Sequence, residues 1–354
     1  MSALTEDKIT TARVRLFNYN PIDDTDKTTL ILSALLLHCY GYWVSTNSIH
    51  NIHAPSEGGQ ENVATDILSA VNDAAIKALA NLYLCGLLAP IRAGGGENSI
   101  IGEHPSRSSF EGNVEEISGL IKIDVAERDQ SVLKGIVLTR DNNRCILTKT
   151  LDVEVVCDLE SSGVVVSEED HRKSGCTIAA HILPFSLAPN LVKFADIQRS
   201  SKVFALIEWF SGFKIVDRLH GIDINRIDNV VTLTLGAHGL FGALRIWLEA
   251  ILAHLTVNQG RPHVYILKNP WGIDSGALVD GAEVTLTTID PRLPVANPDF
   301  LAIHAACVKI YHASGMSEVI DQVLHDKREV KELSEDGLGP SFRVLEYSLV
   351  LFAS

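Results

Sequence analysis

The sequence predicts an α+β protein in which a few short strands are embedded in a mainly helical chain. Long stretches repeat apolar residues at helical spacing, as in residues 62–89 and 114–139. Shorter runs are rich in β-branched residues, as in residues 230–235. A hydrophobic content of 46% over 354 residues is enough to bury a core in more than one domain.

The N-terminal region, residues 1–112, is expected to be helical and to end in a linker. Residues 1–26 are polar and carry turn signals, and Thr25 or Asp26 can cap the leucine-rich helix that follows. The helical pattern of residues 62–89 is the longest in the chain.

Pro90 is expected to end that long helix, because proline lacks the N–H that continues a helix. Residues 93–113 are rich in Gly and Ser and are interpreted as a linker or a long surface loop. We therefore expect three regions, which are 1–112, a central module at 113–255 and a C-terminal α+β extension at 256–354.

The central module is expected to begin with a helix over residues 114–139. The alternation within residues 144–157 indicates a hairpin. Residues 176–180 predict a strand, which Pro184 turns away from the ladder. An insertion at about residues 188–224 carries a helical, aromatic stretch that is expected to pack.

Three polar side chains lie in otherwise apolar surroundings of this module. His181 ends the predicted strand, and Asn229 precedes the β-branched run at 230–235. His238 opens a segment whose apolar residues keep helical spacing as far as Ile251. The C-terminal extension is expected to hold strands near residues 263–269 and 282–289, helices at 299–313 and 316–326, and a final apolar strand.

The pattern Ala-His-Ile-x-Pro, followed much later by Asn, eight residues and His, resembles the HNH nuclease module in the form found in large fungal proteins. Residues 140–148 resemble the opening segment of that module. The resemblance implies a ββα-metal fold, in which a hairpin is followed by one helix. It implies His181 as general base, Asn229 as the residue that orients the base-bearing loop, and His238 as a metal ligand. In this family the N-terminal edge is often an extended strand.

This chemistry suits phosphodiester hydrolysis of DNA or RNA. The reaction needs an activated water, an electrophile on the phosphate oxygens and a fixed geometry. A histidine with a pKa near neutrality suits the base, and a histidine at the start of a helix can offer a ring nitrogen to an ion. The expected cofactor is one divalent metal ion, with Mg²⁺, Mn²⁺, Ni²⁺ and Zn²⁺ left open.

Two positions depart from the family pattern. Family members carry a second ligand immediately before the general base and a third one helical turn after the last histidine, whereas this chain has Ala180 and Gly242 there. Neither residue can bind a metal. His171 is the best candidate for a substitute ligand, and the alternative for His171 is a solvated loop histidine.

The net charge of −14 is unfavourable for a nucleic-acid partner, because phosphate contacts are made by cations. Residues 131–250 are nearly balanced, with 13 Lys and Arg against 14 Asp and Glu. Arg226 and Arg245 are the candidate phosphate contacts, and ordinary surface charges are the alternative for both.

No segment is expected to cross a membrane, and the N-terminus lacks the apolar region of a secretory signal. The six cysteines are scattered and form no CxxC pair, which favours a reducing compartment, the cytoplasm or the nucleus. The oligomeric state is left open.

Three hypotheses remain. The first is a metal-dependent HNH endonuclease. The second is a catalytically degenerate HNH module that serves as a scaffold for nucleic-acid or protein interaction, which Ala180, Gly242 and the acidic surface favour. The third is an unrelated helical protein in which these histidines and asparagines coincide by chance.

Overall fold

The computed structural model describes residues 3–22, 26–38, 57–93, 130–184, 187, 194–212, 214–219, 224–250 and 263–322. Helices and short strands are mixed in it, which confirms the predicted α+β class. The chain forms two compact units, a helical unit of residues 1–123, 186–222 and 306–354 and a mixed unit of residues 124–185 and 223–305. Each unit is built from separated stretches, and the contiguous boundaries expected at 112/113 and 255/256 stay a prediction.

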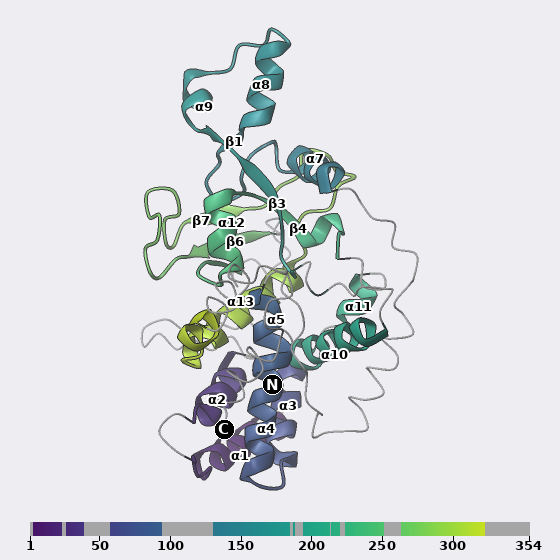
Figure 1. The fold of residues 1–354 in the computed structure, drawn as a ribbon, viewed down its shortest axis with the longest axis vertical. Coiled ribbons are helices and arrows are strands. Elements are labelled where there is room, and N and C mark those ends of the chain that lie inside the picture. Colours follow the sequence, from purple (N-terminus) through teal and green to yellow (C-terminus); the bar gives the residue numbers. More distant parts are fainter. Residues whose placement is uncertain are drawn as a thin grey trace, which may run out of the picture. The chain divides into compact units, whose positions relative to one another are not determined.

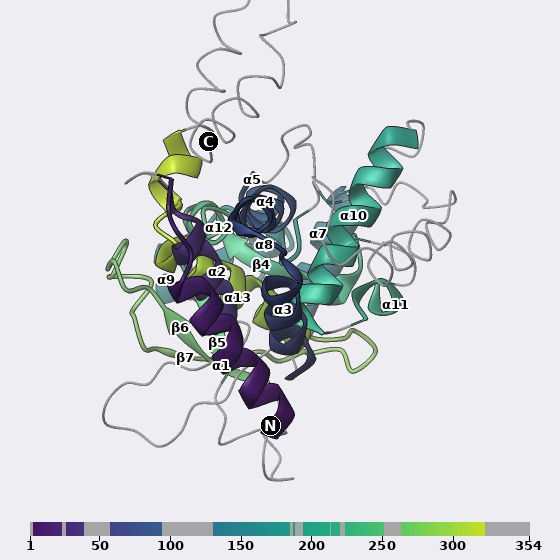
Figure 2. The ribbon, with the colours of Figure 1, turned by 90° about the horizontal axis from the view of Figure 1, so that it is seen from below.

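The helical unit contains α1 to α5 and the helices of the insertion (Figure 1). Its elements are α1 (Ala3–Phe17), α2 (Thr28–His38), α3 (Glu57–Ser69), α4 (Asp73–Tyr83), the π-helical turn η1 (Leu84–Leu88), α5 (Ala89–Ala93), α10 (Phe194–Ser211) and α11 (Ile215–Arg218). Helix α3 packs between α1 and α10, as Figure 2 shows from below.

The expectation of an extended N-terminal edge was wrong, because α1 is helical over Ala3–Phe17 and buries Ile9, Ala12 and Leu16. The leucine-rich helix is confirmed as α2, and Oδ1 of Asp26 accepts the N–H of Thr28 at 3.0 Å.

The long helical pattern of residues 62–89 is divided by a turn, where Oδ1 of Asn72 accepts the N–H of Ala75 at 2.8 Å and starts α4. Pro90 does not end the helix, because the chain passes through the π-helical turn η1 and continues into α5. A π-helical turn shifts the backbone hydrogen-bond register. The chain can therefore continue as a helix although Pro90 has no N–H to donate.

Within the described residues, one helix, Asp73–Arg92, is long and apolar enough for a membrane span by length and composition alone. Within its most apolar window, 61% is buried inside the protein, and buried core helices of this kind pass the same test. The aromatic stretch of the insertion packs as expected, because Nε1 of Trp209 donates to Asp66 at 3.0 Å and its carbonyl accepts from Asn62 at 2.7 Å.

The mixed unit holds three small sheets (Figure 1). Strands β1 (Leu151–Asp152) and β2 (Ser174–Gly175) pair in parallel, β3 (Thr177–His181) and β4 (Val230–Thr234) pair antiparallel, and β5 (Trp247–Ala250), β6 (Val264–Lys268) and β7 (Glu283–Thr285) form an antiparallel sheet. The helical elements are α7 (Gln130–Arg140), α8 (Val153–Ser161), α9 (Glu168–Arg172), the 3₁₀ turn η3 (Ile227–Asn229), α12 (Leu235–Gly242) and α13 (Pro298–Ala313), whose last residues belong to the helical unit.

The strands expected at residues 176–180, 230–235, 263–269 and 282–289 are confirmed as β3, β4, β6 and β7, and the helix expected at 299–313 is α13. Residues 114–129 and the final apolar segment lie outside the described residues.

The hairpin expected within residues 144–157 is confirmed only at an antiparallel bridge between Arg144 and Leu151, and its second alternating stretch, from Val153 on, is helical instead. The side chain of Asp152 accepts the N–H of Glu154 at 2.9 Å, and this cap starts α8 where alternation suggested a second strand. The second carboxylate oxygen of Asp152 accepts both the N–H and the hydroxyl of Thr177, so the same residue holds the start of β3.

The β3–β4 pair is fixed in a register that sets His181 opposite Val230. Its packing on α7 buries Leu133, Val137 and Val230, with Ala179 and Ile227 at the margin. The expected helix beyond His238 is short, because α12 ends at Gly242 and residues Trp247–Ala250 form β5.

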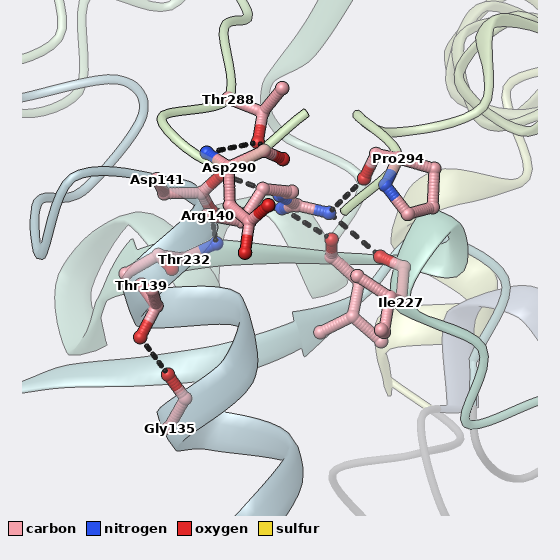
Figure 3. Close-up of polar contacts among 10 residues, drawn as sticks. Gly135, Thr139, Arg140, Asp141, Ile227, Thr232, Thr288, Asp290 and Pro294 are labelled. Atoms are coloured by element: carbon pink, nitrogen blue, oxygen red, sulfur yellow. Dashed lines mark hydrogen bonds and ion pairs between the residues drawn. The ribbon is translucent and has the colours of Figure 1, made fainter. Parts of the chain in front are cut away.

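The buried Arg140–Asp141 pair holds the free edge of β4 (Figure 3). The Arg140 side chain, which is only 2% exposed, donates to the carbonyls of Ile227 at 2.7 Å and Val230 at 2.8 Å. The Asp141 carboxylate accepts the N–H of Thr232 at 2.9 Å. Since β3 occupies the other edge, the start of β4 is held on both sides.

Replacing Arg140 with Met should lower the stability of the mixed unit by about 3–5 kcal/mol, because the Asp141 carboxylate then stays buried without its cation. Urea unfolding followed by circular dichroism measures the change. Arg292→Met is the matched control, since Arg292 pairs with nearby Asp290 but is 88% exposed. A midpoint for Arg140→Met equal to that of the control would contradict the assigned role.

Candidate functional site

His181 is the last residue of β3 and is half-buried. Its Nε2 donates to Oδ1 of Asn225 at 2.9 Å, and Asn225 is only 6% exposed. An amide oxygen can only accept, so this bond places the ring proton on Nε2 and leaves the lone pair of the neutral ring on Nδ1. The imidazole therefore has a defined orientation and a defined basic nitrogen.

Asn229 is fully buried at the start of β4, and its side chain joins two separate stretches of backbone. Its Oδ1 accepts the N–H of Leu183 at 2.9 Å, and its Nδ2 donates to the carbonyls of Leu183 at 3.0 Å and Ile224 at 2.9 Å. The carboxamide thus pins the segment that follows His181 to the segment that carries Asn225. The hydrogen bonds of the Asn229 side chain all go to backbone atoms of the loop, and none goes to the His181 imidazole.

His238 lies in the first turn of α12, directly after β4. Thr234 ends β4 and starts α12, because its hydroxyl oxygen accepts the N–H of Ala237 at 3.3 Å. The His238 ring is half-buried, and its protonated form lowers the pKa of His181. Helix α12 packs on both β3 and β4, so the structure places the two histidines and the asparagine on adjoining elements.

Both rings are expected to be neutral near pH 7. Burial lowers the pKa of His181, the hydrogen bond to Asn225 opposes that effect, and the nearby His238 lowers the pKa further. Burial alone lowers the pKa of His238. A neutral ring can accept a proton or bind a metal ion, so the electrostatics suit both roles that the resemblance implies.

The far end of α12 is supported by a third histidine. The His304 ring stacks on Phe241 with centroids 3.8 Å apart, and its Nε2 lies 3.2 Å from the Phe241 carbonyl oxygen. Burial lowers the pKa of His304 to about 4, so this ring also stays neutral. The helix that carries His238 is therefore held at its first turn by Thr234 and at its last turn by His304.

The described residues include no complete set of metal ligands. Among the described residues, no three His, Cys, Asp or Glu side chains gather where they could hold an ion. Ala180 is buried in β3, and Gly242 ends α12 with open space where a Cβ would lie. His171, the candidate substitute ligand, has an exposed ring in α9 that lies 3.4 Å from Glu160 of α8, and its role as a ligand stays a prediction.

The two candidate phosphate contacts have other neighbours. Arg226 makes a two-pronged ion pair with Asp228, at 2.9 and 3.0 Å. The guanidinium of Arg245 lies 5.9 Å from the centroid of the Trp271 ring. Arg226 is thus neutralised in place, and Arg245 belongs to an aromatic cluster.

Sequence reasoning missed Asn225 and His304. Asn225 stands four residues before Asn229 in a turn-like segment, and nothing in the local pattern separates it from other turn asparagines. His304 sits within an apolar helix, where a histidine is indistinguishable from an ordinary core residue. Only the folded positions of Asn225 and Phe241 reveal their partners.

Comparison of the chain with protein-family models, curated proteins and solved structures finds no match. The geometry described above therefore has to carry the functional argument alone.

The titration of His181 tests the geometry of the site. Asn225→Ala should lower the pKa of His181, because the bond that favours its charged form is lost, and His238→Gln should raise it, because a neighbouring positive charge is removed. NMR of ¹³C- and ¹⁵N-labelled histidine measures both pKa values. Shifts in the same direction for the two variants would show that the three side chains do not share one site.

Proposed function

We propose that β3, β4 and α12 form an HNH-like module that hydrolyses phosphodiester bonds in DNA or RNA, with His181 as the general base. The observation that carries this proposal is the placement of His181, Asn229 and His238 on an antiparallel strand pair followed directly by a helix that packs on both strands. A chance grouping of polar residues has no reason to follow that order of strand, strand and helix.

In this proposal His181 removes a proton from the attacking water through Nδ1. Asn225 keeps the proton on Nε2 and holds the ring in one orientation, because its amide oxygen accepts from that nitrogen at 2.9 Å. Asn229 keeps the loop after His181 and the segment with Asn225 together. A base of lowered pKa stays unprotonated at neutral pH and is available in every catalytic cycle.

A divalent ion, when bound, would polarise the phosphate and stabilise its developing charge. His238 is the protein ligand that this chain offers for it. Solvent and the substrate phosphate would have to supply the remaining coordination, since ligand number sets affinity. The proposal therefore includes weak binding of the ion in the absence of substrate.

The five cysteines that the structure describes are all free thiols, Cys157 and Cys176 among them on the surface. Exposed thiols persist in reducing compartments. We therefore propose that the module acts in the cytoplasm or the nucleus.

The second candidate function is a degenerate module retained as an interaction scaffold. It is favoured by Ala180 and Gly242 at the expected ligand positions and by the Asp228 partner of Arg226. Under this alternative the hydrogen bonds of Asn229 serve the stability of the hairpin and no reaction occurs.

His181→Ala should reduce cleavage of supercoiled plasmid and single-stranded DNA by about 10²–10⁴-fold, which is the usual contribution of a general base. Cleavage is followed on gels with Mg²⁺, Mn²⁺, Ni²⁺ or Zn²⁺. The wild-type rate should fall as the pH drops through the pKa of His181, which lies below the ordinary histidine value. The control is His312→Ala, a histidine of the helical unit, which should cleave as the wild type does. Absence of cleavage by the wild type with every ion would favour the scaffold.

Gly242→His should raise the affinity for Zn²⁺ or Ni²⁺ by roughly an order of magnitude. The new ring would lie one turn after His238 on the same face of α12, and two such histidines can chelate one ion. A Cβ at Gly242 meets nothing within 4 Å, so the backbone there leaves room for a side chain to start. Calorimetric titration measures the affinity.

Gly239→His is the matched control, because Gly239 is equally unobstructed but is adjacent to His238 and faces a different direction. Equal affinities for the two variants would mean that the His238 ring does not point where an ion can reach it.

A further inference from the structure

Trp271 is an exposed tryptophan on a rigidly held loop of the mixed unit. It is 42% exposed, and it follows β6 within residues 269–281. Asn269, which is 1% exposed, donates from Nδ2 to the carbonyls of Ile273 at 2.7 Å and Leu278 at 2.8 Å. Its backbone N–H donates to Asp280 at 2.6 Å. These bonds hold the loop that carries Trp271, whose side chain stays partly exposed to solvent.

Two side chains from the preceding turn and strand complete a cluster around this ring, which we call the tryptophan platform (Arg245, Trp247 and Trp271). The Trp247 ring meets Trp271 edge-on, with centroids 6.4 Å apart, and the Arg245 guanidinium lies 5.9 Å from the Trp271 centroid. Trp247 stands opposite Lys268 in the β5–β6 register, and the Lys268 ammonium lies 3.7 Å from a carboxylate oxygen of Glu249, so Arg245 is the cation nearest the ring. Aromatic faces flanked by cations are typical of surfaces that stack bases and contact phosphates.

The tryptophan platform is tied to the helix that carries His238. The N–H of Arg245 donates to the carbonyl of Leu240 at 2.9 Å, and the N–H of Leu244 donates to that of Phe241 at 3.1 Å. Arg245 is therefore fixed to the C-terminal end of α12.

We infer that the tryptophan platform stacks an unpaired base, and that the substrate is a single-stranded nucleic acid or a single-stranded stretch of one. This inference rests on the proposed nuclease function and names the substrate class of the same site. A duplex keeps its bases stacked inside and offers none to Trp271, whereas a single strand offers a base face at each position. Stacking also suits an acidic protein, because base–aromatic contact does not depend on a basic surface.

The test measures binding apart from catalysis. In the His181→Ala protein with EDTA present, a short fluorescein-labelled oligothymidylate should bind more tightly than a duplex of the same length, as followed by fluorescence anisotropy. Trp271→Ala should weaken this binding at least about fivefold. Trp271→Phe should keep most of the affinity, because the stacking face is retained. Val279→Ala is the matched control, since Val279 is an exposed apolar residue of the same loop.

The inference is overturned by any of three results, which are undiminished binding by Trp271→Ala, equal affinity for the duplex, or no binding of the single strand. A platform that serves a protein partner or a sugar would give the first or the third result. Trp271-dependent binding without cleavage by the wild type would instead overturn the nuclease function and leave the platform intact. The two proposals therefore fail on different measurements.

Discussion

The candidate site depends on how firmly the first residues of β4 are held. One edge of this strand pairs with β3, and the other is closed by the buried Arg140–Asp141 pair. The guanidinium binds the carbonyls of Ile227 and Val230, which lie on either side of Asn229 in the chain. The backbone around Asn229 is therefore held in place. This fixes the direction in which its carboxamide forms hydrogen bonds to the loop after His181. A buried ion pair contributes little net stability compared with an apolar pair, so its value here lies in fixing one backbone arrangement.

Two asparagines divide the orientation of His181 between them. Asn229 acts on the backbone, because all three of its hydrogen bonds go to Leu183 and Ile224. Asn225 acts on the imidazole itself and determines which ring nitrogen keeps the proton. Removing Asn229 would therefore act on the loop, whereas removing Asn225 would act directly on the imidazole.

The sequence predicted the strand–strand–helix order around His181, Asn229 and His238, because β-branched runs and a helix start leave clear local patterns. It could not predict where α12 ends. Leu240, Leu244, Trp247 and Leu248 keep helical spacing, yet the chain leaves the helix at Leu244, which adopts a left-handed φ of 55°. Glycine is the usual residue at such a position, and a buried leucine there gives no signal that the helix stops.

The other errors have the same origin, which is that a local pattern was overridden by a hydrogen bond. The cap at Asp152 turned an alternating segment into α8, and the π-helical turn carried the chain past Pro90. The partners of the site residues were equally invisible, since Asn225 and His181 are 44 residues apart. The candidate residues were thus visible in the sequence, whereas the contacts that position them required the fold.

Burial of the two histidines has different consequences for their two proposed roles. A lowered pKa makes His181 a weaker base, but it keeps the ring unprotonated at neutral pH, where the stronger base would be partly charged. For His238 the same effect removes the competition between a proton and an ion. With no ligand side chain at Ala180 or Gly242, the site would bind an ion more weakly. The neutral histidines would nevertheless not repel the ion. In the proposed mechanism the protein supplies the base and the substrate phosphate supplies much of the coordination. Turnover would then depend most on how the substrate is positioned, and hence on the proposed aromatic surface close to α12.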